Sequence, residues 1–366
     1  MVKEVLEENI IIKSYGDKIS RELDVFYNPI MKLNRDISLL VIKSYFDKKI
    51  KFCDPMAASG IRELRFVKTI PECFDKITMG DVSEIAIENI KKNFKENNLD
   101  LDKIELNRSD AINTIAMQYY DFIEIDPFGS PVPFLDIAIQ RIKHKGILSV
   151  TATDTAALCG TYPKTTARRY NIKVNKTLWY DEVGLRNLIA YCQVQSAKYD
   201  KAIFPIFAYC SDHYYKIFFK VEEGREKANK MLKELSWISW DKKTQNIEIN
   251  ELQTKDSFGK IFVNNYVDKK FISKLMKNLN LIEENKKVEK LINSLNDEED
   301  ILGYYIPSKF QKEFKISTCP KFEVIEEELK KRKYKFSRTH NNKDGIKTDC
   351  DYKIFIEILK NKFKNT

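Results

Sequence analysis

The sequence predicts an α/β protein in which a doubly wound, mostly parallel sheet is followed by a smaller α+β domain. Between Lys51 and Val221, short apolar runs alternate with longer amphipathic segments, which is the pattern of parallel strands joined by helices. The last two apolar runs follow each other closely, so we expect them to pair antiparallel at one edge. Because the pattern changes near Val221 and 366 residues suffice for two domains, we expect domains at residues 1–221 and 222–366.

The strands of the predicted sheet are short apolar runs, many of whose residues are β-branched or aromatic. They are Ile50–Cys53, Lys76–Gly80, Ile104–Asn107, Asp121–Ile125, Gly146–Thr151, Ala202–Tyr209 and Tyr214–Val221. The helices between them repeat apolar residues at helical spacing. They are Ile61–Thr69, Ser83–Asn97, Ala111–Gln118, Val132–Ile142 and Gly184–Lys198. One more helix, within Asn28–Asp47, is expected to begin after Pro29 and to precede the first strand.

The second domain is predicted to mix helices and strands. Its expected segments are a helix at Glu222–Leu235, strands within Asp241–Val267, a helix at Phe271–Ile292, an acidic loop at Leu295–Gly303, a helix at Phe322–Lys335, a polar turn at Arg338–Thr348 and an apolar run at Ile354–Leu359. Residues 305–366 hold 16 basic and 9 acidic residues, which accounts for most of the net charge of +9. Aromatic residues lie among these cations, a composition that suits contact with a nucleic-acid backbone. The alternative is a solvated helix whose charges pair with one another.

Composition excludes several classes of protein. Apolar stretches such as Ala202–Cys210 are far shorter than the roughly 20 residues of a membrane helix, and the acidic N-terminus is unlike a secretory signal. We therefore expect a cytoplasmic protein without membrane contact. Seven cysteines without a CxxC pair, together with only three histidines, predict reduced thiols rather than a metal site. No stable protein partner is indicated, and a monomer is expected.

The turn after the first strand of the sheet predicts a ligand site. The sequence DPMAASGIR, from Asp54 to Arg62, leads from a strand into a helix, which is where open α/β sheets bind ligands. It is neither a GxGxxG turn nor a P-loop. Asp81 and Asp110 end the next two strands, where carboxylates can bind ribose hydroxyls and an adenine amino group. This arrangement favours S-adenosylmethionine over NAD or ATP, although each residue alone could serve a structural turn or a helix cap.

The residues predicted to carry the chemistry follow the fourth strand, in the sequence IDPFGSP. An aromatic amino group is a poor nucleophile because its lone pair is delocalised into the ring. The Asp126 carboxylate and the Pro127 carbonyl can each accept one of its N–H groups and turn the lone pair toward a methyl donor, while Phe128 stacks on a flipped-out base. These residues resemble the Asp/Asn-Pro-Pro-Tyr/Phe motif of methyltransferases acting on exocyclic amino nitrogens. The alternative is a turn that only ends the strand.

Four segments together resemble the tRNA (guanine-26-N2)-dimethyltransferase family: VFYNPIMKLNRDIS, DPMAASGIR, EIDPFGSP and VTATDTAALCGTYP. Two further matches, SDHYYKIF and SRTHNNKDGIKTD, extend the resemblance over nearly the whole chain. The resemblance implies a class I, Rossmann-like methyltransferase domain joined to a smaller domain that binds tRNA. It also implies transfer of one or two methyl groups from S-adenosylmethionine to N2 of guanosine 26 in tRNA.

The matching motifs also imply roles for individual residues. The cofactor-binding residues that the resemblance implies are Arg35, Arg62, Asp81, Asp110 and Ala111. Asp126 would be catalytic, together with Pro127 and Phe128 beside it. Phe26 or Phe128 would sandwich the guanine.

The C-terminal signature of the family is less informative. Arg338 and Lys347 fall within it and are expected to contact tRNA, whereas His340 is as readily a structural residue as an RNA contact. His213 is expected at a core strand position. Many family members carry a cysteine-rich zinc ribbon early in the second domain, but Trp237–Phe262 contains no cysteine.

Two other functions stay open on the sequence alone. One is a DNA or protein amino-methyltransferase, because related Asp/Asn-Pro-Pro-Tyr enzymes act on adenine, cytosine and glutamine amides. The other is a non-catalytic RNA-binding protein that retains the cofactor fold. Analysis of the nucleoside product would discriminate among the three.

Overall fold

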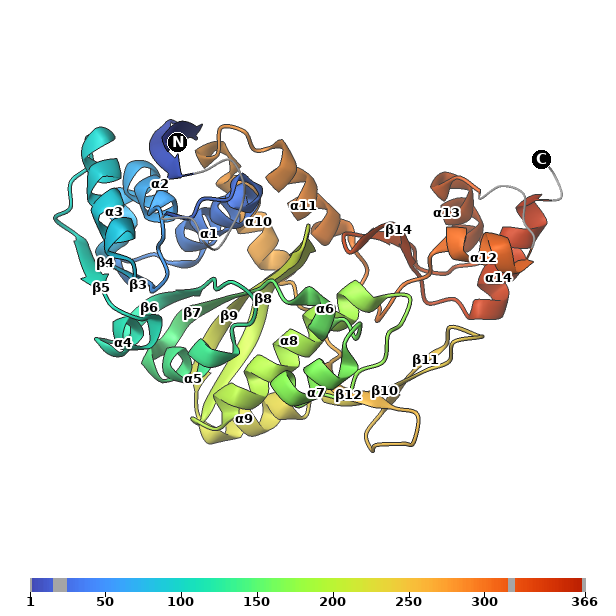
Figure 1. Cartoon of the computed structure of the whole chain (residues 1–366). Coiled ribbons are helices and arrows are strands. Elements are labelled where there is room, and N and C mark those ends of the chain that lie inside the picture. The colour runs from blue at the N-terminus through green and yellow to red at the C-terminus, as the bar shows by residue number, and fades with distance from the viewer. Residues whose placement is uncertain (1, 16–24, 315–319, 364–366) are drawn as a thin grey trace.

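The computed structural model describes residues 2–15, 25–314 and 320–363, and its largest element is a seven-stranded sheet (Figure 1). The strand order is β5-β4-β3-β6-β7-β9-β8. The strands are β3 (Ile50–Asp54), β4 (Phe74–Asp81), β5 (Ile104–Arg108), β6 (Tyr120–Ile125), β7 (Ile142–Ala152), β8 (Lys201–Ser211) and β9 (Tyr214–Glu223). The first five are parallel, and β9 runs antiparallel to both β7 and β8. The predicted doubly wound sheet with an antiparallel edge is confirmed.

Helices cover both faces of this sheet, as Figure 1 shows. One face carries α1 (Lys32–Tyr45), α2 (Ile61–Thr69) and α3 (Glu84–Glu96), and the other carries α4 (Ala111–Ala116), α5 (Val132–Arg141) and α8 (Tyr180–Ala197). The central strand β6 is buried along its whole length, as a parallel strand between two helical layers must be. Two short helices, α6 (Thr155–Leu158) and α7 (Pro163–Tyr170), lie between β7 and α8, where the apolar periodicity predicts no element.

An N-terminal hairpin packs outside the sheet, against α2 and α3. Its strands are β1 (Val2–Glu7) and β2 (Ile10–Tyr15), and Ile10 and Ile12 are fully buried. Asn97, which follows α3, accepts a hydrogen bond from the Ile11 amide at 2.9 Å and donates one to the Ile11 carbonyl at 2.6 Å. These contacts fix the hairpin, which the sequence pattern does not predict.

The apolar core of the sheet continues past Val221. Helices α9 (Arg225–Leu232), α10 (Lys269–Lys277) and α11 (Lys286–Asp297) contribute to the same continuous cluster as the sheet. A second sheet, in the order β11-β10-β12, packs against α8 through an apolar cluster that includes Trp179 and Phe258. Its strands are β10 (Leu235–Trp240), β11 (Ile247–Asn250) and β12 (Phe258–Phe262). The division of the chain at residue 221 stays a prediction.

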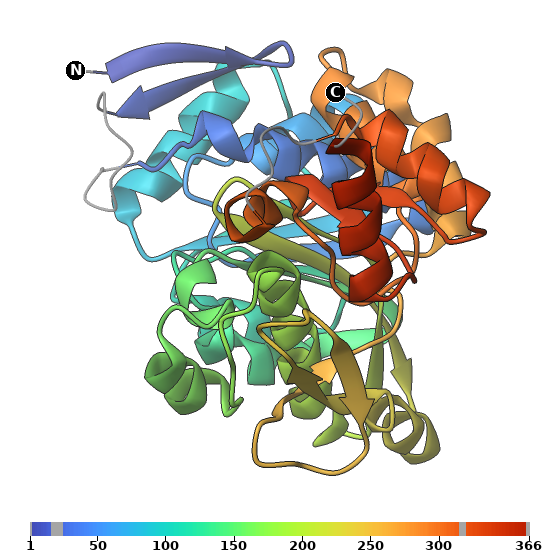
Figure 2. The same cartoon turned by 90° about the vertical axis from the view of Figure 1, so that its right-hand side faces the viewer.

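The last elements of the chain form an apolar cluster of their own. They are α12 (Pro307–Phe314), α13 (Phe322–Lys331), β13 (Ser337–Thr339), β14 (Asn342–Lys347) and α14 (Tyr352–Phe363). Figure 2 looks onto these elements and shows the N-terminal hairpin and the β10–β12 sheet at opposite ends of the molecule. The polar turn expected at Arg338–Thr348 is wrong, because this segment is the β13–β14 hairpin and Ile346 is fully buried in the cluster.

Two other expected elements have different boundaries in the structure. The helix expected at Phe271–Ile292 is divided between α10 and α11 by the 3-10 turn Leu279–Leu281. The interruption is fixed by a tertiary contact, since Asn278 donates to the Ser44 hydroxyl of α1 at 2.9 Å. The acidic loop expected at Leu295–Gly303 begins inside α11, and Glu298 is buried rather than solvated.

Two further observations concern the described residues as a whole, namely their helices and their cysteines. Within the three described ranges, no helix is long and apolar enough to cross a membrane. Six cysteines are described, all unpaired and five of them buried, as expected for reduced thiols, while Cys319 lies outside the described residues.

Candidate active site

A cavity of about 600 Å³ opens at the carboxyl ends of β3, β4 and β6. Its walls come from the turn after β3, the first residues after β4, the Asp126–Phe128 segment after β6, the segment before α1 and the β8–β9 turn. Parallel strands all point their carboxyl ends to one edge of the sheet, so residues far apart in sequence meet there. Asp54, Arg62, Asp81 and Asp126 all line this cavity.

The turn after β3 holds its shape through backbone and carboxylate contacts. The Ala57 amide donates to the carbonyl of Gly80 at 2.9 Å, and the Met56 amide donates to Asp54 Oδ1 at 2.9 Å. Gly60 has a φ of +73°, and an added Cβ there would lie 3.1 Å from Ile90, so glycine is favoured at this position. The small residues of the turn leave its backbone open to the cavity.

Asp81 connects the ends of β3 and β4. Its Oδ2 accepts a hydrogen bond from the Ala58 amide at 3.1 Å, and its Oδ1 accepts one from the Ser83 amide at 2.9 Å. Ser83 itself caps α3 by accepting from the Ala86 amide at 3.2 Å. The reading of Asp81 as the helix cap is therefore wrong, because Ser83 fills that role. Each oxygen of Asp81 keeps a lone pair that a ligand hydroxyl can use.

A group of charged side chains reaches from the cavity wall into the core, and we name it the Arg62 cluster: Asp54, Arg62, Glu124, Asp126 and Lys216. The guanidinium of Arg62 contacts three carboxylates, with Nη2 2.5 Å from Asp126, Nε 3.3 Å from Asp54 and Nη1 3.4 Å from Glu124. A planar guanidinium presents several donors in a fixed geometry and so can hold several carboxylates in place at once. Arg62 thereby orients the carboxylate of Asp126.

Glu124 and Lys216 form the deepest part of the Arg62 cluster. Both are fully buried, and they pair with each other. Glu124 also accepts hydrogen bonds from Ser38 at 3.2 Å and Ser149 at 3.1 Å. Burial alone would raise the pKa of Glu124, but the charges of Arg62 and Lys216 outweigh it and lower this pKa. Burial lowers the pKa of Lys216, and the adjacent Glu124 opposes that shift.

No motif in the sequence assigns a role to Glu124 or Lys216. Each is a charged residue with apolar or aromatic neighbours on both sides in its strand, and such a residue must find a partner when that part of the strand is buried. That pattern is the signal that could have drawn attention to them.

Two further carboxylates in the same region have raised pKa values. Burial raises the pKa of Asp54 to about 6, although the charge of Arg62 opposes the shift. Burial also raises the pKa of Glu63 well above its usual range, and nearby Asp54 adds to the effect. Perturbed carboxylates of this kind are common where a cavity wall carries chemistry.

Two aromatic rings face each other at the mouth of the cavity. The centroids of Phe26 and Phe128 are 4.5 Å apart, with the planes at 82°. Phe128 is 47% exposed, whereas the preceding Pro127 is buried. The following turn is tied to the end of β7, because the Gly129 amide donates to the Thr153 hydroxyl at 2.7 Å. An exposed ring beside an oriented carboxylate can receive a planar, unstacked base.

Comparisons with known proteins agree with this geometry. Residues 3–360 match the model of the N2,N2-dimethylguanosine tRNA methyltransferase family. The chain belongs to this family. A tRNA (guanine(26)-N(2))-dimethyltransferase from Pyrococcus horikoshii is 36% identical over 92% of this chain and 92% of its own length. The tRNA (guanine(26)-N(2)/guanine(27)-N(2))-dimethyltransferase of Aquifex aeolicus is 34% identical over 98% of this chain and 95% of its own.

A solved structure supports the fold as well. Trm1 from Pyrococcus horikoshii, in complex with S-adenosyl-L-methionine, has a TM-score of 0.89 to this chain at 33% identity, covering 98% of this chain and 99% of the other. The predicted class I methyltransferase architecture and the resemblance to the dimethyltransferase family are therefore confirmed.

The cofactor residues that membership of the dimethyltransferase family implies differ in their surroundings. Arg62 and Asp81 line the cavity, as described. Arg35 also lines it, but its guanidinium pairs with Glu7 and donates to the Asn28 carbonyl at 3.2 Å. Although burial raises the pKa of Glu7, the charges of Arg35 and Arg65 bring it down to about 2. In this structure, Arg35 therefore joins the N-terminal hairpin to the start of α1.

The other two residues expected to bind the cofactor, Asp110 and Ala111, are not among the residues that line the cavity. Asp110 caps α4, since its side chain accepts from the Asn113 amide at 3.0 Å. Ala111 is buried behind it as the first residue of α4. Their contact with a cofactor stays a prediction.

His213 differs from its predicted place. It was expected inside a core strand, but Asp212 and His213 form the exposed two-residue turn between β8 and β9. The register pairs Ser211 with Tyr214, which leaves both turn residues outside the ladder. The expected core position is therefore wrong, and His213 lines the mouth of the cavity.

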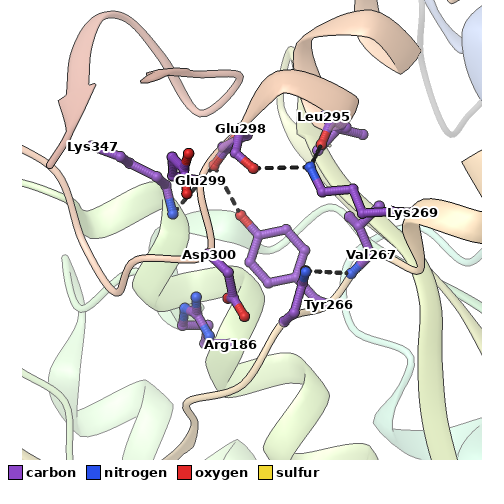
Figure 3. Close-up of a pocket in the computed structure, with 10 residues that line it drawn as sticks. Arg186, Tyr266, Val267, Lys269, Leu295, Glu298, Glu299, Asp300 and Lys347 are labelled. Carbon is purple, nitrogen blue, oxygen red and sulfur yellow. Dashed lines mark hydrogen bonds and ion pairs between the residues drawn. The ribbon is translucent and has the colours of Figure 1, made fainter. Parts of the chain in front are cut away.

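Two residues of the C-terminal family signature, His340 and Lys347, meet Glu182 and Glu298 in a second buried group, which we name the Glu298 cluster. Figure 3 shows Glu298 and Lys347 of this cluster. The amine of Lys347 lies 3.0 Å from Glu182, 3.2 Å from Glu298 and 2.7 Å from the Ile301 carbonyl, and its side chain is 2% exposed. This geometry favours a structural role for Lys347 over contact with RNA.

His340 and Arg338 also find partners within the protein. His340 Nδ1 is 2.7 Å from Glu298 Oε2, and Nε2 accepts a hydrogen bond from the Cys210 amide at 3.3 Å. These contacts support the structural alternative for His340. Arg338 is exposed and donates to the Lys343 carbonyl at 2.7 Å, while its guanidinium lies 4.3 Å from the centroid of the Phe322 ring. Neither residue lies in the cavity wall.

The part of the chain that the structure describes contains no group of three His, Cys, Asp or Glu side chains placed to hold a metal ion. In the β10–β12 sheet, Ile238, Phe258 and Ile261 pack together with Trp179. Apolar packing holds this sheet against α8.

Proposed function

We propose that this chain transfers one or two methyl groups from S-adenosylmethionine to the exocyclic N2 of guanosine 26 in tRNA. The products are N2-methylguanosine and N2,N2-dimethylguanosine. The observation that carries the proposal is the Asp126-Pro127-Phe128 segment at the end of β6, where an oriented carboxylate and an exposed ring share one cavity. Membership of the dimethyltransferase family and the names of the relatives support it.

The cavity fits the methyl donor in size and chemistry. A volume of about 600 Å³ lies within the range of small-molecule and cofactor sites. Asp81 offers free lone pairs to the ribose hydroxyls, and the turn around Ala57 and Ala58 allows close approach of the ligand to the backbone. We assign Arg35, Arg62, Asp110 and Ala111 to cofactor binding through the matching family motifs. When bound, the cofactor supplies an electrophilic sulfonium methyl group.

The residues of this chain prepare the amine for attack. The Asp126 carboxylate and the Pro127 carbonyl accept the two N–H groups of guanine N2, so that the lone pair is directed out of the ring plane toward the methyl group. Phe26 and Phe128 hold the ring in place. Arg62 keeps the carboxylate of Asp126 in one orientation, which avoids the reorganisation that a free carboxylate would need.

Each transfer releases one proton. The new N–C bond forms as the S–C bond breaks, which leaves a neutral thioether and a positively charged nitrogen. The nitrogen then loses a proton, which the Asp126 carboxylate accepts or passes to solvent. A second round requires the monomethylated amine to rotate, so that its remaining N–H points to one of the two acceptors.

We also propose the organisation in which this reaction occurs. Residues 1–221 hold the catalytic site, and residues 222–366 contribute to tRNA binding. The protein acts in the cytoplasm as a monomer, because nothing in the sequence indicates a stable protein partner. Light scattering at micromolar concentration tests the oligomeric state, and a mass near twice 43.0 kDa would contradict it.

The function is tested by incubating the protein with labelled S-adenosylmethionine and an unmodified tRNA transcript, then digesting the RNA to nucleosides. We expect label in N2-methylguanosine and N2,N2-dimethylguanosine at position 26. Asp126→Ala should lower kcat about a thousandfold, because it removes the side chain that accepts one N–H of guanine N2. Asp136→Ala on α5 is the matched control, since Asp136 lies outside the cavity wall. A fully active Asp126→Ala enzyme would sink the proposal.

A further inference from the structure

The segment that follows Asp154 is strongly basic. From Thr155 to Tyr180 it contains five cations and no carboxylate: Lys164, Arg168, Arg169, Lys173 and Lys176. All five are exposed, and three of them lie on α7. Residues 305–366 are also basic overall, but acidic residues lie among their cations, whereas this segment has none.

This basic segment is anchored beside the proposed catalytic residues. At the end of α7, the Tyr170 hydroxyl lies 2.8 Å from the Ser130 hydroxyl and donates to Asp154 at 2.7 Å. Ser130 is two residues past Phe128, and Asp154 directly follows Thr153, which lines the cavity. The position of α7 is therefore fixed with respect to the cavity mouth, although α7 contributes nothing to its wall.

The charges of α7 are not neutralised in the way that a solvated helix usually is. Within the described ranges, no carboxylate forms an ion pair with Lys164 or Arg168, and only Arg169 has such a partner, Asp154 at 2.6 Å. On α13 the arrangement is the opposite, since Lys330 pairs with Glu326 along the helix. Lys164 and Arg168 are four residues apart and so share one face of α7.

An exposed aromatic ring accompanies these cations. Tyr162 is 60% exposed at the residue before α7. Cations that track a backbone beside a ring that can stack on a base are the usual elements of a surface that binds single-stranded or distorted nucleic acid. The hollow at β10 and β11 lacks this character, because its three lysines are balanced by Asp241, Glu248 and Asp256.

We propose that the exposed face of α7 binds phosphates of the tRNA backbone next to the target guanosine. The proposal rests on the proposed function, and it assigns Lys164 and Arg168 to a docking surface that stands apart from the cofactor cavity. Because the guanosine must leave its stack to reach the cavity, a nearby clamp on the backbone holds the distorted RNA in position. The proposed contacts are electrostatic, so their contribution should fall steeply with salt.

The test compares two double variants in binding and in turnover. Lys164→Gln/Arg168→Gln removes the two cations of α7 that pair with no carboxylate of the described residues, and Lys92→Gln/Lys95→Gln removes two exposed cations of α3 as the matched control. Affinity for an unmodified tRNA transcript is measured by fluorescence anisotropy across a salt series. Losing two phosphate contacts should make the slope of log K against log salt less steep by about 1.5. The control should keep the slope of the unmodified protein.

In turnover, the α7 variant should raise the KM for tRNA about tenfold at physiological salt, with kcat and the Kd of S-adenosylmethionine unchanged. Lys164→Glu/Arg168→Glu should raise KM further, and circular dichroism should show that both variants fold. An unchanged salt slope, or an effect equal to that of the α3 variant, would overturn the proposal. If the unmodified protein made no N2-methylguanosine, the proposed function would fail, while the salt slopes would still report whether α7 binds RNA.

Discussion

The Arg62 cluster and the Glu298 cluster contain the same kinds of charged side chain, but the space beside each cluster differs in size. Each joins carboxylates to buried cations and satisfies them with hydrogen bonds to neighbouring groups. The Arg62 cluster ends at a cavity of about 600 Å³, whose wall includes the half-buried Asp126. The space beside the Glu298 cluster is only about 10 Å³, which is enough for one water molecule (Figure 3).

The difference separates two uses of buried charge. In the Glu298 cluster, Glu182 of α8, Glu298 after α11, and His340 and Lys347 of the C-terminal hairpin come from three parts of the chain, so the pairing joins those parts. In the Arg62 cluster, the fully buried members hold one reactive carboxylate at a surface open to ligand. We therefore expect changes in the Glu298 cluster to affect mainly stability, and changes in the Arg62 cluster to affect turnover.

The largest effect should come from Glu298→Ala. Removing this carboxylate leaves Lys347 and His340 buried with fewer partners, which should lower the free energy of unfolding by about 4 kcal/mol. Urea denaturation measures the loss, and Asp300→Ala, which removes an exposed carboxylate two residues away, is the control. The kcat of the folded variant should stay within twofold of the unmodified enzyme. A large fall in kcat without loss of stability would remove the distinction between the clusters.

The two clusters should also respond oppositely to pH. Burial raises the pKa of Asp54 from 3.8 to about 6 in the folded protein, so the native state binds the proton more tightly than the unfolded state. This group should therefore lower stability as pH rises from about 4 to about 6, by about 3 kcal/mol for a shift of about two units. Asp54→Asn should abolish that decline in pH-dependent urea unfolding.

Glu298 has the opposite sign. Although burial raises its pKa, His340 and Lys347 outweigh burial and hold this pKa below its usual value. Its contribution to stability is therefore complete above about pH 4.5 and is lost as pH falls below that value. If Asp54→Asn and Glu298→Ala changed the pH dependence of the free energy of unfolding in the same direction, the expected difference between the two clusters would be contradicted.

Arg62→Lys should separate positioning from cofactor binding. Lysine keeps the charge but loses the planar fork that holds three carboxylates, so we expect kcat to fall about a hundredfold, or about 2.7 kcal/mol. Calorimetry of S-adenosylmethionine binding then measures any contact of Arg62 with the cofactor. A kcat unchanged from that of the unmodified enzyme would show that Asp126 needs no such support.

The smallest effect should come from Lys330→Ala. Lys330 and Glu326 form an exposed pair one helical turn apart on α13, and solvent screens such a pair. The free energy of unfolding should change by less than about 0.5 kcal/mol, measured in the same denaturation experiment. A loss as large as that of Glu298→Ala would mean that burial does not explain the strength of the inner clusters.

The local pattern predicted the sheet more reliably than the elements around it. Strands such as β6 and helices such as α2 follow from runs and spacings within a few residues, and their boundaries agree with the structure to within a residue or two. The N-terminal hairpin and the break after α10 depend on contacts of Asn97 and Asn278 with distant segments. No local pattern records such contacts, so the sequence could not predict these features.

The candidate site shows the same limit. Asp54, Asp81 and Asp126 could be placed together because parallel strands end at one edge of a sheet. Lys216 could not, because its strand enters the sheet through an antiparallel hairpin whose register only packing decides. Lys347 was expected to contact tRNA because it falls within the family's C-terminal signature, yet two carboxylates from distant segments enclose it.

By itself, the sequence determined the strands of the central sheet and the helices that join most of them, the chemistry at the strand ends and the family to which the chain belongs. Periodicity, turn residues and short motifs are local properties, and a single chain records them fully. Only the tertiary structure decided which charges pair, because a buried ion needs a partner within a few ångströms, whatever its distance in sequence. For that reason Arg62 pairs with Asp126, and His340 and Lys347 of the C-terminal signature pair with carboxylates from distant parts of the chain.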